Sequence, residues 1–460
     1  MRTAGKNAMH ASSNRQLWLG LLLAVLVTLS RLPFLNAGYG ENVDAWRVAR
    51  AARHLAQTGS YEVSRFPGYP VHEITSSFFR SFGAVGLNGL SAAFSIAAVL
   101  AIWLIARRLR CRPSFLVALA FAATPVFYVN SVTAKDYVWA IAFVLWAFYA
   151  ALGGRSVLCG LLLGLAIGCR ITSGAMFIPL AMVLCGASES KLPWKTLVKF
   201  AVCAGVTACV AFLPVWMHYG RGFFTFYENH ERPDLMTIWL RGSVEVWGAF
   251  GLAGLLVLLL AAIFGRFISQ PTEKPAPAAN RMAIPALVTI VAIYLVAYFR
   301  LPDQAGYLIP IVPALLLLGS RFAPSPAVAL ECVCFLLAPW IDFSQAGFCA
   351  GAIIADHRAR LQNLQSIERF AQATEKALPG RNTVVVGAWE PIIGELPVSA
   401  GTHNRYVYLL SAAEAEALTD RGEGIAYASD TVRAFNIRVA KLDLAKHGAR
   451  NVRQILVGVP

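Results

Sequence analysis

Long apolar segments alternate with short polar breaks from Leu17 to Trp340. A hydrocarbon core about 30 Å thick needs roughly 20 apolar residues per helix, and such segments recur along this part of the chain. We therefore predict an α-helical polytopic membrane domain with about eleven transmembrane helices. Segment 156–184 is too long for one helix and is interrupted at Gly168-Cys169-Arg170, so it is divided into two short helices. The other spans are expected at about 17–35, 89–106, 114–130, 137–152, 200–217, 246–264, 283–299, 307–320 and 325–341.

The pattern changes after about Phe343, where the chain becomes mixed, charged and patterned like alternating helices and strands. Helical and strand-like segments follow one another at Asp356–Leu378, Thr383–Val386, Tyr406–Leu410 and Ala412–Leu418. This pattern predicts one small C-terminal α/β domain. We expect two domains, residues 1–343 in the membrane and residues 344–460 in water.

Composition supports a membrane protein. Hydrophobic residues make up 57% of the 460 positions and charged residues only 14%, which is too apolar for a soluble globular chain. The net charge of +15 comes largely from Lys and Arg beside the apolar segments, as the positive-inside rule expects, so no nucleic-acid partner is predicted. The nine cysteines lie mostly inside apolar segments without metal-type spacing and are interpreted as small core residues.

Charge also predicts the orientation in the membrane. The first apolar segment follows basic residues and lacks a convincing cleavage site, so we interpret it as a retained helix with a cytoplasmic N-terminus. This orientation leaves loops 36–88 and 218–245 and the C-terminal domain on the outer side. It also places the densest basic cluster in a cytoplasmic loop, at Arg107, Arg108, Arg110 and Arg112.

Acidic and basic residues from separate loops are expected on the outer face. Such convergence is typical of a single site, although outer loops also need charge for solubility. If residues 42–56 are helical, Glu41 caps the helix and Asp44 lies in its first turn, where a carboxylate also stabilises the helix dipole. The residues in question are Glu41, Asp44, Glu73, Asp136, Arg170, His230, Arg300 and Asp303.

Four segments in order resemble the C-type (GT-C) glycosyltransferases, which include protein O-mannosyltransferases and bacterial aminoarabinose transferases. The first outer loop has an acidic motif followed by Pro67-Gly-Tyr-Pro70, and Thr124-Pro-Val-Phe leads to a second outer loop carrying Asp136. The later two are Gly160-Leu-Leu-Leu-Gly-Leu-Ala-Ile-Gly-Cys-Arg170 and Asp303-Gln-Ala-Gly-Tyr307-Leu-Ile-Pro-Ile-Val-Pro313. The likeness covers roughly residues 17–320.

The resemblance implies transfer of a sugar from a polyprenyl-phosphate donor to a hydroxyl on the outer side of the membrane. A first-loop carboxylate would act as general base, with Asp44 preferred over Glu41 because this chain has Glu-x-x-Asp where several relatives carry adjacent acids. Asp136 would orient the acceptor or, with Asp44, bind a divalent cation, and metal use is left open. Arg170 and Arg300 would neutralise the donor phosphate. Substrate-binding positions are expected at Tyr69, His72, Glu73, Asp303 and Tyr307.

The same resemblance implies a multi-pass protein of the bacterial inner membrane, whose membrane domain is surrounded by lipids. Its C-terminal domain is expected in the periplasm. The acceptor could be a glycan, a lipid or a protein, and a hexose or a pentose would suit the site. The alternatives are a polytopic transporter or lipid-linked glycan flippase, and a glycan ligase or polymerase. Transporters place ionisable residues near the bilayer midplane and often contain repeats, whereas here the helix centres carry little charge and no half-chain repeat is visible.

Overall fold

The structure is a computed structural model that describes residues 2–187, 193–224, 233–268, 278–344, 347–396, 402–428 and 452–455. The chain forms two compact units. Unit 1 comprises Met1–Asn36 and Ala51–His357, and unit 2 comprises Ala37–Arg50 and Arg358–Pro460. Residues 37–50, which were expected in the membrane domain, thus group with the C-terminal region.

Unit 1 is built from helices. Five helical stretches among the described residues are long and apolar enough to cross a membrane, and shorter apolar helices accompany them, as a multi-pass membrane protein requires. The helices are α1 (Arg2–Arg31), α3 (Pro70–Phe79), α4 (Gly83–Arg108), α5 (Ser114–Ala123), α6 (Pro125–Asn130), α7 (Tyr137–Leu152), α8 (Ser156–Cys169), α9 (Phe177–Ala187), α10 (Trp194–Tyr219), α11 (Leu235–Gly242), α12 (Val244–Ile268), α13 (Ala278–Arg300), α14 (Ile311–Phe322) and α15 (Ser325–Leu337). Helix α2 (Val43–Thr58) begins in unit 2 and ends in unit 1.

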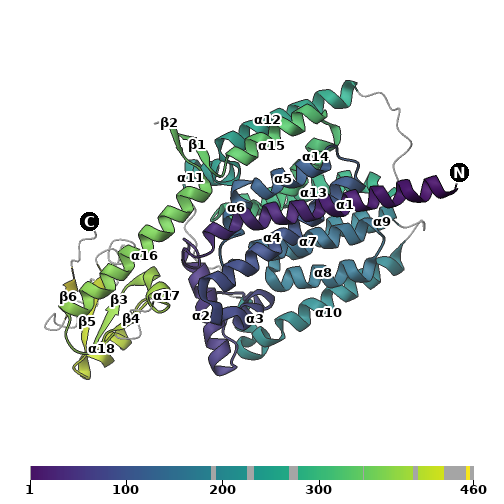
Figure 1. The fold of residues 1–460 in the computed structure, drawn as a ribbon. Helices are drawn as coiled ribbons and strands as arrows, with labels where there is room; N and C mark the ends of the chain where they lie inside the picture. The colour runs from purple at the N-terminus through teal and green to yellow at the C-terminus, as the bar shows by residue number, and fades with distance from the viewer. Residues whose placement is uncertain are drawn as a thin grey trace. The chain divides into compact units, whose positions relative to one another are not determined.

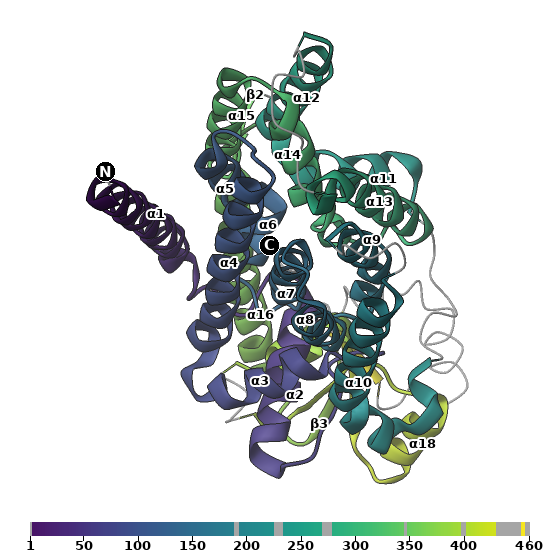
Figure 2. The same ribbon diagram turned by 90° about the vertical axis from the view of Figure 1, so that its right-hand side faces the viewer.

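The helices of unit 1 pack in two groups. Helices α1, α4, α7, α8 and α10 follow one another as a row, each in contact with the next (Figure 1). Helices α5, α12, α14 and α15 form a second group, and α13 packs against α14 and α9 (Figure 2). The core between them is apolar and tightly filled, with Ile102, Phe121, Val138 and Val312 almost fully buried.

The predicted interruption at Gly168-Cys169-Arg170 is present. Helix α8 ends at Cys169, Arg170 has an extended backbone, and a 3₁₀ turn over Ile171–Met176 leads into α9. The glycines before the interruption allow α8 to approach α10 closely. A Cβ atom on Gly164 would lie 2.4 Å from Cβ of Thr207, and one on Gly160 would lie 2.5 Å from the Phe200 carbonyl oxygen. Small residues at this spacing serve helix association in membranes.

Two expected spans differ from the structure. The single helix predicted at 114–130 is divided at Thr124, because Pro125 has no N–H and disfavours a helical residue before it. The helix predicted to end at 341 ends at Leu337, and an antiparallel hairpin of β1 (Ile341–Ser344) and β2 (Gly347–Ala350) follows. Asp342 of β1 accepts a hydrogen bond from the backbone N–H of Ala249 at 2.9 Å, just after α12 kinks.

Unit 2 has the predicted α/β character. Its parallel sheet has the strand order β4-β3-β5-β6, and Val385, Leu418, Ile425 and Tyr427 form its core. The chain passes from β3 to β4 on one side and then crosses to β5 on the other side of β3. In α/β domains a crevice forms outside the carboxyl ends of the strands at such a reversal. Helix α16 (Ala352–Ala377) begins in unit 1 and ends in unit 2. The other elements of unit 2 are β3 (Asn382–Val385), α17 (Glu390–Ile393), β4 (Arg405–Val407), α18 (Ala412–Asp420), β5 (Gly424–Ala428) and β6 (Val452–Ile455).

Candidate functional site

Asp136 of unit 1 lies between two arginines. Its side chain is fully buried just before α7, where Arg65 donates to Oδ1 at 2.8 Å and Arg170 donates to Oδ2 at 2.7 Å. Both carboxylate oxygens are therefore engaged by guanidinium groups. Two positive charges against one negative charge leave the cluster with a net charge of +1, which suits an anionic ligand.

Aromatic rings hold the two guanidinium groups in place. The Arg170 guanidinium lies 4.1 Å from the centre of the Tyr137 ring and 4.9 Å from that of Tyr307. The Arg65 guanidinium lies 4.2 Å from the centre of the Tyr69 ring and also donates to the Tyr69 hydroxyl at 3.1 Å. Cation–π contacts of this kind stabilise a partly desolvated cation. The predicted positions Tyr69 and Tyr307 thus contact the arginines.

Glu73 organises the loop that carries Arg65. Its buried carboxylate accepts hydrogen bonds from the backbone N–H and hydroxyl of Ser64, the Tyr61 hydroxyl and the Tyr69 N–H. These donors lie on both sides of Arg65 in sequence. Glu73 was expected to bind substrate. In the structure its hydrogen bonds hold the loop of residues 61–69 and so fix the position of Arg65.

The charge state of Asp136 follows from its neighbours. Burial alone would raise the pKa of Asp136, but Arg170 and Arg65 outweigh it and hold the pKa at about 2. The carboxylate stays ionised at physiological pH and has little tendency to take a proton. The Asp136 carboxylate is therefore suited to positioning the guanidinium groups of Arg65 and Arg170 and not to general-base catalysis.

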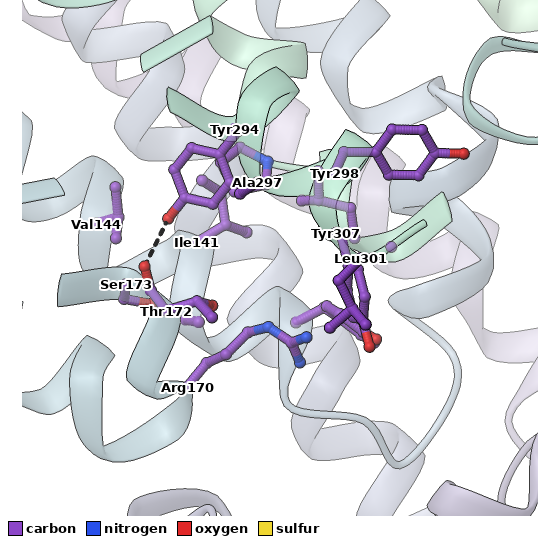
Figure 3. Close-up of a pocket in the computed structure, with 15 residues that line it drawn as sticks. Ile141, Val144, Arg170, Thr172, Ser173, Tyr294, Ala297, Tyr298, Leu301 and Tyr307 are labelled. Atoms are coloured by element: carbon purple, nitrogen blue, oxygen red, sulfur yellow. Dashed lines mark hydrogen bonds between the residues drawn. The ribbon is translucent and has the colours of Figure 1, made fainter. Parts of the chain in front are cut away.

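A narrow cavity of about 90 Å³ opens beside Arg170. Figure 3 shows Arg170 at one end, with Thr172 and Ser173 nearby and apolar side chains such as Ile141 and Leu301 along the walls. The Tyr294 hydroxyl donates to the Thr172 carbonyl at 3.2 Å. The cavity thus has the Arg170 guanidinium at one end and apolar walls formed by α7, α13 and the segment before α14.

The other predicted positions of unit 1 lie in different surroundings. His72 is buried, with its ring 4.8 Å edge-on from that of Trp139, and its Nδ1 has no hydrogen-bond partner among the described residues. Arg300 is the exposed last residue of α13, and Asp303 follows in the connection to α14. Neither Arg300 nor Asp303 is among the described residues that line the cavity. His230 lies outside the described residues.

Asp44 belongs to unit 2, in the first turn of α2. The helix cap differs from the prediction, because Asn42 and not Glu41 accepts the backbone N–H of Asp44, at 2.9 Å. Asparagine reaches this N–H with its short amide oxygen, while the Glu41 side chain is exposed. The Asp44 carboxylate is half-buried and lies 3.5 Å from Arg47.

The start of α2 is anchored to the carboxyl end of the sheet of unit 2. Arg50 forms an ion pair with Glu390, which follows β3, and the Arg47 guanidinium lies 5.6 Å from the centre of the Tyr408 ring after β4. Glu390 follows β3, which flanks the strand-order reversal, and Tyr408 follows β4, the neighbouring edge strand. The start of α2, which carries Asp44, is therefore held at the carboxyl ends of β3 and β4.

Sequence analysis did not select Arg65, Tyr137 or Tyr294. Arg65 was visible as a cation in the acidic first loop, shortly before the Pro-Gly turn, but its pairing with Asp136 is a tertiary contact 71 residues away. For Tyr137 and Tyr294 the sequence offered no indication of a functional role beyond their positions in or near the ends of expected helices. Within the described residues, no three His, Cys, Asp or Glu side chains gather closely enough to hold a metal ion.

Comparisons with known proteins identify the fold. Residues 72–218 match the family model of dolichyl-phosphate-mannose-protein mannosyltransferases. The structure is similar to ArnT from Cupriavidus metallidurans in the apo state, with a TM-score of 0.56 and 14% identity over 92% of this chain and 95% of that one. The chain has the fold of the GT-C membrane glycosyltransferases. The resemblance drawn from the four sequence motifs is therefore confirmed.

A second GT-C structure matches almost as well. It is the same ArnT bound to undecaprenyl phosphate, with a TM-score of 0.53 and 15% identity over 95% of this chain and 89% of that one. No curated protein matches the sequence. The two structural matches cover 92% and 95% of this chain, while the family match covers the region from His72 to His218, which contains Asp136 and Arg170.

Proposed function

We propose that this GT-C protein transfers a sugar from a polyprenyl-phosphate donor to a hydroxyl acceptor. The observation that carries the proposal is the Arg65–Asp136–Arg170 cluster, whose net positive charge borders an apolar cavity among membrane helices. A lipid phosphate needs both a cation and an apolar wall. The similar fold of an ArnT bound to undecaprenyl phosphate supports this donor class.

The reaction places distinct demands on the residues. The bond between the anomeric carbon and the phosphate oxygen breaks, and the bond electrons leave with the polyprenyl phosphate. Arg170, which lines the cavity, meets the negative charge that develops on this leaving group, and Arg65 adds to the local positive potential. Asp136 holds both arginines and acts as a positioning residue.

Asp44 is the proposed general base. The acceptor hydroxyl forms the new bond to the anomeric carbon, and its proton must pass to a nearby carboxylate. Asp44 is a half-buried carboxylate in the acidic motif of the first loop, whereas Asp136 is kept ionised by two guanidinium groups at 2.7 and 2.8 Å. Glu41 is the exposed neighbour in the same motif and serves as the matched control.

The setting of the reaction is part of the proposal. We place the protein in a bacterial inner membrane, with a cytoplasmic N-terminus and with Asp136, Asp44 and the C-terminal unit on the periplasmic side. The distribution of basic residues at the helix ends supports this orientation. The acceptor is a glycan, lipid or protein hydroxyl, and the sugar is a hexose or a pentose.

The experiment measures transfer from a panel of radiolabelled polyprenyl-phosphate sugars to membrane-extract acceptors by the purified protein in detergent. The panel compares the wild type, Asp44→Asn and Glu41→Gln. Removal of a general base costs about 10²–10⁴-fold in rate, so Asp44→Asn should lose transfer to that extent while Glu41→Gln retains it. Normal transfer by Asp44→Asn would remove Asp44 from the mechanism, and no turnover with any donor would contradict the proposed function.

One observation favours the transporter alternative. Glu331 lies within α15, is almost fully buried, and neither of its carboxylate oxygens has a hydrogen-bond partner among the described residues. Ionisable residues inside membrane helices often mark ion pathways. We favour the transferase because the cationic cluster lies at the helix ends. Transfer activity that survives in Glu331→Gln supports this choice, and proton-coupled uptake abolished by the same change would support the transporter.

A further inference from the structure

A second hollow in unit 1 is rich in arginine. It has a volume of about 520 Å³ and is lined by Arg110, Arg112 and Arg321 together with Phe264 and Phe322. A smaller cavity of about 70 Å³ shares Arg110 and Arg321 and adds Arg281. We call these two hollows together the arginine groove. It contains none of the residues of the Asp136 site.

The arginine groove lies at the opposite ends of the helices that build the Asp136 site. Helix α13 begins near Arg281 and ends at Arg300, directly before Leu301 of the cavity at Arg170. Its 23 residues span about 35 Å at 1.5 Å per residue, close to the thickness of a hydrocarbon core. The arginine groove is therefore at the level where lipid headgroups of the other leaflet lie.

Arginines from three separate parts of the chain meet in this groove. Arg110 and Arg112 lie between α4 and α5, Arg281 lies at the start of α13, and Arg321 lies at the end of α14. No Asp or Glu is among the described residues that line either hollow. The positive-inside rule accounts for basic residues near helix ends, but it does not require that they line one shared hollow.

The loop that carries two of these arginines is fixed by the fold. Cys111, between them, is buried, and its backbone N–H donates to the Ala106 carbonyl at 2.8 Å. Its thiol lies 3.6 Å from the Leu317 carbonyl of α14. Arg110 has a φ of 59°, in the left-handed region that residues with a Cβ atom rarely adopt. The fold thus maintains a rarely adopted backbone conformation beside the groove.

We propose that the arginine groove binds the phosphate of an anionic membrane phospholipid. Arginine presents several donors in a planar fork that matches phosphate oxygens, and basic pockets between membrane helices bind acidic headgroups. Phe264, Phe322 and Ala261 supply an apolar wall for the start of the acyl chains. The same phosphate chemistry occurs in free phosphate, but the apolar wall favours a lipid.

The test measures lipid binding to the purified full-length protein by native mass spectrometry. The probes are phosphatidylglycerol and phosphatidylcholine, with inorganic phosphate as a competitor. The variants are Arg110→Gln, Arg321→Gln and their double combination. Arg155→Gln is the matched control, because Arg155 is an exposed arginine between α7 and α8, at the same ends of the helices but outside the arginine groove.

Each groove arginine near the membrane surface contributes about a fivefold change in affinity. Each single variant should therefore bind phosphatidylglycerol about fivefold more weakly and the double variant about 25-fold more weakly, with Arg155→Gln unchanged. Equal binding by wild type and double variant would overturn the proposal. So would equal affinity for phosphatidylcholine, or arginine-dependent binding of inorganic phosphate without lipid binding. If the double variant does not fold, Arg112→Gln must show the same fivefold loss.

Discussion

Replacement of Asp136 by asparagine tests the Arg65–Asp136–Arg170 cluster of unit 1. The change keeps the shape of the side chain but removes its charge, and it places an amide N–H₂ where one guanidinium group now donates. Two charge-assisted hydrogen bonds, at 2.7 and 2.8 Å, are affected in a fully buried position. Arg65 and Arg170 then lose their shared counter-charge.

The magnitude follows from two arguments. The pKa of Asp136 falls from 3.8 to about 2, and at 1.36 kcal/mol per pKa unit the surroundings favour the ionised form by about 2 kcal/mol. Removal of one member of a buried ion pair costs about 3–5 kcal/mol, because the remaining charge is uncompensated. We expect Asp136→Asn to lower the free energy of unfolding by about 2–4 kcal/mol.

The sign of the pH dependence is also defined. Because the folded state lowers the pKa of Asp136, its contribution is complete above the unfolded pKa of about 3.8 and is lost as the pH falls towards about 2. The difference in melting temperature between wild type and Asp136→Asn should thus be constant from about pH 5 to 8 and shrink below about pH 4.

The assay combines thermal unfolding in detergent with donor turnover. Asp136→Asn should raise the donor KM and lower kcat, because Arg170 is no longer held towards the cavity. Asp420→Asn serves as the control, since Asp420 is an exposed aspartate at the end of α18. The reasoning is refuted if Asp136→Asn melts and turns over like the wild type, or if the melting difference persists unchanged at low pH.

Three further changes test the surroundings. Gly164→Val should lower the melting temperature, because overpacking costs about 1–3 kcal/mol where a Cβ atom would already lie 2.4 Å from Thr207, and Gly205→Val, which has open space, should not. Glu73→Gln should raise the donor KM by loosening the loop around Arg65, and faster proteolysis of that loop would show the cause. Glu390→Arg should lower kcat with a stability change under about 1 kcal/mol, as expected for an exposed pair, and Arg50→Glu in the same chain should restore kcat.

The membrane helices could be predicted largely from sequence because the hydrophobic pattern determines them directly. The interruption before Arg170 was also predictable, since glycine and arginine inside an apolar segment mark an end. Breaks and kinks within the helices were harder to predict from the sequence. The division at Thr124 follows from the tendency of a proline, here Pro125, to disfavour a helical residue before it. The kink at Gly248 depends on its positive φ, which no local sequence pattern indicated.

The site was predictable in its residue types and much less in its pairings. Asp136 and Arg170 were selected from their positions at helix ends, yet the sequence did not indicate that they contact each other or that Arg65 completes the cluster. Long-range ion pairs depend on packing that brings distant loops together. For the same reason the grouping of residues 37–50 with the C-terminal unit, through contacts such as Arg50 with Glu390, was not foreseen.

The most direct test of the account is a cryo-electron microscopy structure of the protein with bound polyprenyl phosphate. We predict that the phosphate lies within hydrogen-bond distance of Arg170, with the first isoprene units against Ile141 and Leu301. A phosphate bound elsewhere, with Arg170 in contact only with Asp136, would contradict the assignment of the cavity as the donor site.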